Sequence, residues 1–411
     1  MMEKSSGIQK TYLLLTLLNT LAASFIWGIN TIFLLDAGLS NLEAFAANAF
    51  FAAGQVLFEV PTGIIADMYG RRVSYLLGTI TLGISTYLYL YAWQIHAPFL
   101  YWAITSVLLG LGFTFFSGAT EAWLVDALKF TKFKGNLDSV FAKAQVVGGV
   151  AMLSGSVLGG YIAQITNLGV PYIIRAVMLF LTFFIAFFKM RDLGFSPKKT
   201  KKPLMEIKKI FNTSINLGFK NPSVRYIMLS SLFLTGVSFY VFYAMQPYLL
   251  ELYGDKEAYL VAGLAASIIA GSRIVGGFLV PLIRKIFKKR TSVMIFGVLA
   301  GSILLGASGL THSFILAIIL LVLWGLLSAA ITPVRQAYLN GLIPSKQRAT
   351  MLSFDSLVGS TGGVVVQPAL GKVADVGGYG ASFMVGAVIQ AIALPFVILA
   401  KKQNVKSDSN K

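Results

Sequence analysis

The stretch "FEVPTGIIADMYGRRVS", residues 58–74, begins as an apolar helix and ends in a cluster of charged residues. Its first part is suited to lipid, yet it contains Glu59. Its second part brings Asp67 close to Gly70 and two arginines. A carboxylate inside an apolar helix is costly unless it has a partner or a function. The reason for Glu59 in an apolar helix, and for the charged cluster that follows it, has to be sought in the rest of the sequence.

Composition places this chain in a membrane. Of its 411 residues 56% are hydrophobic and only 12% are charged, which does not describe a soluble globule. The net charge of +18 comes from short Lys and Arg clusters between long apolar runs. That pattern is typical of loops facing anionic lipid headgroups, and it argues against nucleic-acid binding. With no cysteine and only two histidines, we expect neither a metal nor a cofactor.

Apolar runs of roughly 20 residues predict membrane-spanning helices, and the chain contains twelve such runs. They begin near Thr11, Glu43, Val73, Phe99, Ser139, Pro171, Val224, Ala258, Ser292, Phe314, Thr350 and Ala381. The predicted domains are a six-helix bundle at 1–190, a linker at 191–223, a second bundle at 224–401 and a cytoplasmic tail at 402–411. Within the linker, "MEIKKIFNTSINLGF" has the pattern of a short amphipathic helix on the membrane surface.

Most of the 34 lysines and arginines fall in loops on one side of the predicted bundles. By the positive-inside rule this predicts a multi-pass protein of the cell membrane, plasma or bacterial inner, with both termini in the cytoplasm. The first apolar run exceeds the length of a signal peptide's apolar core and lacks a small-residue cleavage site, so we interpret it as a retained helix.

The two halves resemble each other. "TEAWLVDAL" in the fourth run matches "RQAYLNGL" in the tenth, so that Trp123 falls opposite Tyr338. Aligning Gly63 with Gly277 also places Glu59 opposite Arg273. Many transporters are built from such repeats around a central site, so the internal similarity favours transport.

The segment "GIIADMYGRR" resembles the signature loop between helices 2 and 3 of the major facilitator superfamily. The matching positions are Gly63, Asp67, Gly70, Arg71 and Arg72. The resemblance implies an all-α membrane protein of twelve helices in two pseudo-symmetric six-helix bundles. It also implies secondary transport by alternating access.

In the family this loop is a conformational latch. The resemblance implies that Asp67 interacts with the positive N-terminal end of helix 11, while Gly70 allows a tight turn. Asp126 is interpreted as a partner for Arg71 or Arg72. The alternative is that the arginines only fix the topology.

The fifth run, "GGVAMLSGSVLGG", resembles the glycine-proline element of proton-driven exporters of the superfamily, which suggests a bacterial efflux type. Gly155, Gly159 and Gly160 match that element, but Ser156 stands where proline is expected. The fourth run also lacks the arginine that is typical of drug-proton antiporters. The direction of transport therefore stays open, and close helix packing is the alternative role for these glycines.

Polar and aromatic residues in the spans supply the candidate sites. Glu59 and Glu121 are the proton-coupling candidates, because a desolvated carboxylate tends to take up a proton. Candidates for the substrate cavity are Asn30, Trp123, Tyr240, Tyr243, Gln246, Arg335 and Tyr338. Candidates for inter-bundle packing or ion pairs are Gly155, Gly159, Gly160, Lys143, Arg273 and Asp355.

The sequence thus predicts a secondary active transporter that couples protons to the export of small amphiphilic organic molecules. We expect a monomer whose partners are its substrate, protons and membrane lipids. An importer or facilitator of a polar metabolite is the alternative, and a membrane sensor that does not transport is a weaker one. No nucleophile-base pairing or metal-ligand spacing suggests an enzyme.

Overall fold

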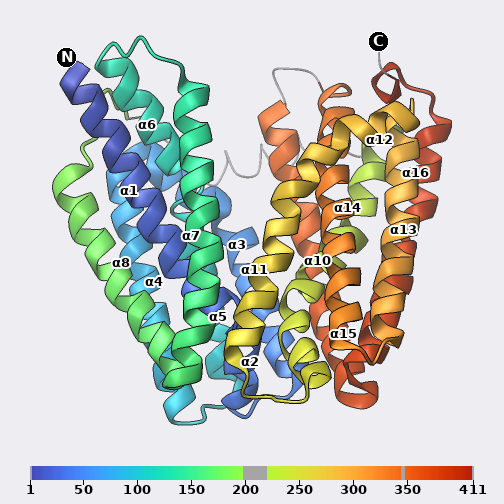
Figure 1. The fold of residues 1–411 in the computed structure, drawn as a ribbon. Coiled ribbons are helices and arrows are strands. Elements are labelled where there is room, and N and C mark those ends of the chain that lie inside the picture. The colour runs from blue at the N-terminus through green and yellow to red at the C-terminus, as the bar shows by residue number, and fades with distance from the viewer. Residues whose placement is uncertain (1, 198–219, 344–347, 410–411) are drawn as a thin grey trace. The chain divides into compact units, whose positions relative to one another are not determined.

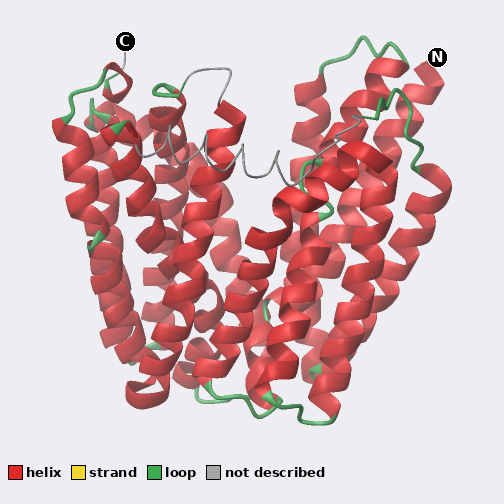
Figure 2. Ribbon diagram, turned by 180° about the vertical axis from the view of Figure 1, so that it is seen from behind, coloured by secondary structure: helices red, strands yellow, loops and turns green. Residues whose placement is uncertain are grey.

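The computed structural model describes residues 2–197, 220–343 and 348–409. These residues form helices joined by loops, and they contain no strand (Figure 2). The amphipathic helix predicted within the linker lies outside the described residues.

Ten helices of the described part are long and apolar enough to cross a membrane, or eleven if one bent pair counts as a span. The last of the ten, Met351–Lys402, has 52 residues, far more than the roughly 20 that one crossing needs. Its backbone leaves the helical conformation at Gly378, where φ is +78°. The chain is therefore an all-helical multi-pass membrane protein, while the count of twelve spans stays a prediction.

The chain forms two compact units. Unit 1 contains the described residues 2–38, 50–197 and 257–267, and unit 2 contains 39–49, 220–256, 268–343 and 348–409. The predicted domain boundaries adjoin or fall within a segment that is only partly described, so they stay predictions.

Most of unit 1 comes from the first eight helices (Figure 1). They are α1 (Met2–Trp27), α2 (Asn30–Asp36), α3 (Asn41–Tyr69), α4 (Arg71–Gln94), α5 (Phe99–Thr114), α6 (Ala119–Phe130), α7 (Leu137–Ile165) and α8 (Gly169–Lys189). Helix α1 packs against α7 and α8, and α4 packs against α5 and α8.

Small residues of α7 allow its close approach to α1. A Cβ atom at Gly159 would overlap the carbonyl oxygen of Phe25, and one at Gly155 would lie 2.6 Å from the Cβ atom of Ser24. The third glycine of the predicted element, Gly160, lies against the Tyr259 backbone, which also belongs to unit 1. All three glycines thus lie at close helix contacts inside unit 1, and their role in transport stays a prediction.

The Gly159→Ala variant is expected to destabilise the protein by about 1–3 kcal/mol, because backbone must move to admit one methyl group. Gly148→Ala in the same helix is the matched control, since a Cβ atom there would meet its nearest neighbours at 3.8 Å. Thermal unfolding of both purified variants checks the prediction. Equal unfolding midpoints for the two variants would contradict it.

Unit 2 contains the remaining helices and the first turns of α3 (Figure 1). The helices are α10 (Pro222–Tyr253), α11 (Tyr259–Gly276, in unit 2 from residue 268), η1 (Gly277–Leu279), α12 (Val280–Ile286), α13 (Arg290–Leu310), α14 (Phe314–Asn340), α15 (Arg348–Ala391), α16 (Ala393–Lys402) and η3 (Lys406–Asp408). Helix α15 packs against α10 and α13, and α16 packs against α10.

The start of α3 is held inside unit 2 by α15. The two carboxylate oxygens of Asp375 accept hydrogen bonds from the backbone N–H groups of Asn41 at 2.8 Å and Leu42 at 3.0 Å. A carboxylate at this position satisfies free N–H groups of the helix and opposes the positive end of its dipole. The ring of Phe45 lies 4.7 Å from that of Tyr240, centroid to centroid.

Candidate functional site

In unit 1 the carboxylate of Glu59 on helix α3 lies beside a break in the fourth predicted span. Helix α5 ends at Thr114 and α6 begins at Ala119, so the span is interrupted between them. The hydroxyl of Ser117, inside the break, donates a hydrogen bond of 2.5 Å to Oε1 of Glu59 on α3. Both side chains are exposed in the structure.

Two features produce the break. Gly118 has φ of +67°, a left-handed conformation that glycine adopts without a steric penalty. The Ser74 hydroxyl of α4 donates a buried hydrogen bond of 2.7 Å to the carbonyl of Phe115, the residue that follows the end of α5. Interrupted membrane helices frequently border ion or substrate sites, because their free backbone groups need partners that lipid cannot supply.

Further charged side chains of unit 1 are also exposed. Glu121 lies in the first turn of α6, just after the break, and Lys143 lies near the start of α7. Charged side chains on spanning helices usually face water or protein rather than lipid. These residues therefore suit a hydrated surface of the unit.

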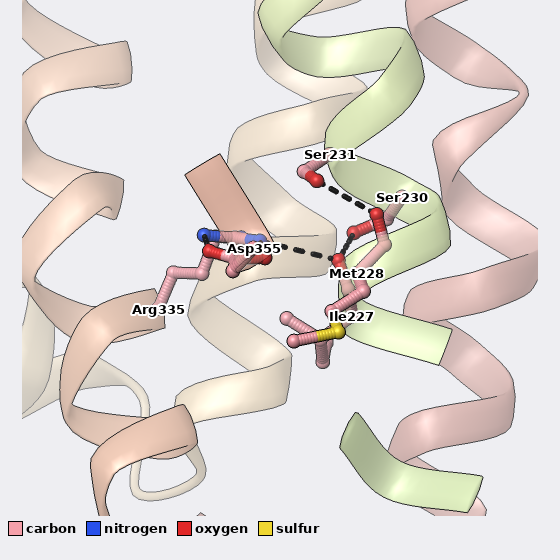
Figure 3. A network of polar contacts seen from close by, with 6 residues as sticks. All are labelled: Ile227, Met228, Ser230, Ser231, Arg335 and Asp355. Atoms are coloured by element: carbon pink, nitrogen blue, oxygen red, sulfur yellow. Dashed lines mark hydrogen bonds and ion pairs between the residues drawn. The ribbon is translucent and has the colours of Figure 1, made fainter. Parts of the chain in front are cut away.

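In unit 2 two predicted residues form one ion pair. The guanidinium of Arg335 on α14 binds the carboxylate of Asp355 on α15 through two hydrogen bonds, of 2.7 and 2.5 Å, and faces it directly in Figure 3. The side chains are only 17% and 10% exposed. Nη2 of Arg335 also lies 3.4 Å from the carbonyl oxygen of Ile227 on α10.

Two serines of α10 donate hydrogen bonds to carbonyls of the same helix beside this pair. Ser230 donates a hydrogen bond of 2.7 Å to the carbonyl of Ile227, and Ser231 donates one of 2.7 Å to Met228 (Figure 3). The Ile227 carbonyl therefore accepts from both a serine and the arginine. The ion pair thus connects three helices of one unit, and within the described residues it is not an inter-bundle contact.

The predicted latch residues make contacts inside unit 1. Asp67 near the end of α3 pairs at 2.6 Å with Arg71, the first residue of α4. Nη2 of Arg72 donates a hydrogen bond of 2.6 Å to the carbonyl of Phe187, and its guanidinium lies over that ring. The contact of Asp67 with helix 11 stays a prediction, as does the pairing of Asp126 with an arginine of this loop.

Gly70 forms the turn between α3 and α4 with φ of +112°. A Cβ atom there would overlap the carboxylate of Asp192, which accepts a hydrogen bond of 2.9 Å from the backbone N–H of Arg72. Burial raises the pKa of Asp192 above its ordinary value, while this N–H and the charges of Arg72 and Arg71 lower it in part. Asp192 was not predicted as a functional residue, because it falls in a polar segment interpreted as linker.

Most predicted cavity residues lie in the interiors of the units. Trp123, Tyr240, Gln246 and Tyr338 are buried, Asn30 is 9% exposed and Tyr243 is half-buried. The indole N–H of Trp123 donates to the carbonyl of Arg191 at 2.8 Å, and the hydroxyl of Tyr240 donates to Ser382 at 2.5 Å. Their contact with substrate stays a prediction.

Arg273 and Arg175 are two further arginines in spans. Nη2 of Arg273 donates a hydrogen bond of 2.8 Å to the hydroxyl of Ser238 within unit 2. Arg175 is 1% exposed in unit 1, where its Nε donates to the hydroxyl of Thr86 at 3.0 Å. Arg175 was not singled out as a candidate, although an arginine in an apolar run is itself a signal of a polar interior.

The family model of the Major Facilitator Superfamily matches residues 12–307 and 278–411, which together include nearly the whole chain. The chain belongs to the major facilitator superfamily. It therefore resembles the membrane transporters of that superfamily over nearly its whole length.

A curated relative of this superfamily member is an uncharacterized MFS-type transporter of Methanocaldococcus jannaschii. The two are 23% identical over 231 residues, which is 56% of this chain and 57% of the relative. The matched part thus spans just over half the length of that relative.

Solved structures of two transporters share the fold. The nucleoside transporter NupG is 10% identical, with a TM-score of 0.80 over 96% of this chain and 99% of NupG. A bacterial homolog of the human lysosomal transporter Spinster is 17% identical, with a TM-score of 0.73 over 99% of each chain. At these identities the similarity establishes the fold and not the substrate.

Proposed function

We propose that this superfamily member is a secondary active transporter that couples protons to the export of small amphiphilic organic molecules. The observation that supports coupling is Glu59, an exposed carboxylate on a spanning helix that accepts a hydrogen bond at the break of the fourth span. A carboxylate at such a place can bind and release a proton during a transport cycle. Glu121, just beyond the break, is the second proposed carrier.

The energy available to one proton is sufficient for efflux. A membrane potential of 100 mV supplies about 2.3 kcal/mol per charge, and one pH unit supplies about 1.4 kcal/mol. Together they support a substrate gradient of about 500-fold.

A specific observation favours a second function, the import or facilitated uptake of a polar metabolite. Export through the glycine-proline element would favour proline at position 156, but Ser156 is present and is buried against the packed helices. Among proteins of similar fold is a transporter of nucleosides, which are polar metabolites. The Arg335–Asp355 pair would then be a candidate contact for a charged or hydrogen-bonding substrate.

The finer topology belongs to the same proposal. We propose twelve spans in two six-helix bundles, both termini in the cytoplasm, a location in the cell membrane and a monomeric state. The clusters of Lys and Arg between apolar runs support the orientation.

Transport by purified protein in proteoliposomes tests the proposal. Uptake and counterflow of lipophilic cations, nucleosides, sugars and amino acids would be measured with and without an imposed proton gradient. Proton-dependent movement of lipophilic cations is the expected result. Movement of a polar metabolite alone would favour the second function, and no counterflow with any member of the panel would oppose both.

A further inference from the structure

Two aspartates from outside the spans cap helix N-termini at the same helical position. In unit 1 the backbone N–H of Arg72, the second residue of α4, donates to Asp192 at 2.9 Å. In unit 2 the backbone N–H of Thr291, the second residue of α13, donates to Asp408 at 2.7 Å. The Thr291 hydroxyl donates to the other oxygen of Asp408, also at 2.7 Å.

The residue before each aspartate contacts the fourth span of the same unit. The carbonyl of Arg191 accepts a hydrogen bond of 2.8 Å from the indole of Trp123 on α6. The hydroxyl of Ser407 donates one of 2.6 Å to the carbonyl of Tyr338 on α14. Trp123 and Tyr338 are the positions that the sequence repeat aligns, so the two arrangements correspond in sequence as well as in structure.

Both aspartates stabilise a helix N-terminus by accepting hydrogen bonds from its free N–H groups. The first N–H groups of an α-helix have no partner within the helix, and a negative charge near them is favourable because the helix dipole is positive there. Asp408 is 2% exposed, so its carboxylate depends on these donors for the hydrogen bonds that water would otherwise provide.

Segment 403–409 is anchored on unit 2 by further contacts. Nζ of Lys289 donates a hydrogen bond of 2.9 Å to the side-chain oxygen of Asn404, and Arg290 donates to the carbonyl of Ser407. Val405 packs against a buried cluster. That cluster includes Ile227, Met228, Tyr338, Leu339, Met351 and Phe354.

This cluster also borders the ion pair of unit 2. Ile227 supplies a carbonyl to Arg335, and Phe354 immediately precedes Asp355 in α15. Tyr338 lies three residues after Arg335 on α14, which places the two on neighbouring turns of one helix face.

We infer that in each unit two consecutive residues after the last span hold two helices together. The aspartate binds the N-terminus of the third span, and the residue before it contacts the fourth span. We call this arrangement an aspartate clamp. The clamp of unit 1 is Arg191–Asp192, and that of unit 2 is Ser407–Asp408. Through Tyr338, the second clamp positions the turn of α14 that carries Arg335. The role of Arg335 in transport rests on the proposed function, but the clamp does not.

Amide hydrogen exchange of the full-length chain tests the clamp without any transport assay. In Asp408→Ala, exchange at 291–294 and 336–341 is expected to accelerate about fivefold, the factor that accompanies the loss of one helix cap. Residues 315–325, at the other end of α14, should exchange as in the wild type. Lys406→Ala, an exposed change in the same segment, is the matched control and should alter neither region.

The corresponding test of unit 1 is Asp192→Ala, which should accelerate exchange at 72–75 and 123–128 but not at 100–106. Wild-type exchange in either aspartate variant would overturn the clamp in that unit, and uniform acceleration along α14 would overturn the positioning of its final turns. Thr291→Val retains the backbone donor and should give a smaller effect of the same kind. If Asp408→Ala does not fold, wild-type exchange in Thr291→Val overturns the second clamp.

Discussion

Replacing Glu59 with glutamine is expected to abolish proton-driven accumulation of substrate while leaving exchange of substrate down its own gradient intact. Glutamine cannot release a proton, so it imitates the protonated carboxylate throughout the cycle. Its amide can still accept the hydrogen bond that Ser117 donates to Glu59. The break in the fourth span should therefore survive the substitution.

Proton flux and substrate counterflow would be measured on the same purified variant. Ser117→Ala is the matched control, because it removes the donor but leaves an ionisable carboxylate, so proton-driven accumulation should persist. Glu121→Gln is made alone and together with Glu59→Gln, since Glu121 is the second proposed carrier. Full coupling in the double variant would remove both glutamates from the mechanism.

Misfolding is the outcome expected if Glu59 has a structural role instead. Thermal unfolding and yield of each variant separate the two explanations. A Glu59→Gln protein that folds normally and exchanges substrate, yet cannot accumulate it, is compatible only with a role in coupling.

The Arg335→Leu variant is expected to lose about 3–5 kcal/mol of stability, because it leaves the carboxylate of Asp355 buried without its partner. In the wild type two hydrogen bonds from one guanidinium compensate that carboxylate. Thermal unfolding of the purified variant would show this as a large decrease in the unfolding midpoint.

The double variant Arg335→Leu, Asp355→Leu is the control for this prediction. Replacing both members of a buried pair with apolar side chains is often nearly neutral, so most of the stability should return. A single variant as stable as the wild type would contradict the prediction. Transport by the double variant then asks a separate question, namely whether the pair does more than hold helices together.

Hydropathy was sufficient to predict an all-helical membrane protein, because the energetic cost of exposing backbone to lipid leaves few alternatives. Break positions were harder to predict. The glycine of "FSGATE" is a common signal for a break, but the bond from Ser74 that stabilises this one comes from another helix.

The sequence predicts which charged residues matter, but it does not predict which residue each of them pairs with. Arg335 and Asp355 were both recognised as charged residues in apolar runs, yet one was assigned to the cavity and the other to an inter-bundle contact. Helical periodicity gives the face on which a side chain lies but not the helix opposite to it. Asp192 and Asp408 were missed because hydropathy cannot distinguish a docked polar segment from a solvated one.

The clamp of unit 1 bears on how the chain folds while it is being synthesised. A ribosome makes the chain from its N-terminus, and domains tend to fold as units while synthesis continues. Asp192 lies three residues after the end of α8, so the carboxylate that caps α4 is made before α10 and the helices that follow it. Of the described residues assigned to unit 1, only 193–197 and 257–267 are then still missing. Most of unit 1 can therefore form its internal contacts early, and α10 to α16 are translated after the N-terminus of α4 has already gained its hydrogen-bond acceptor.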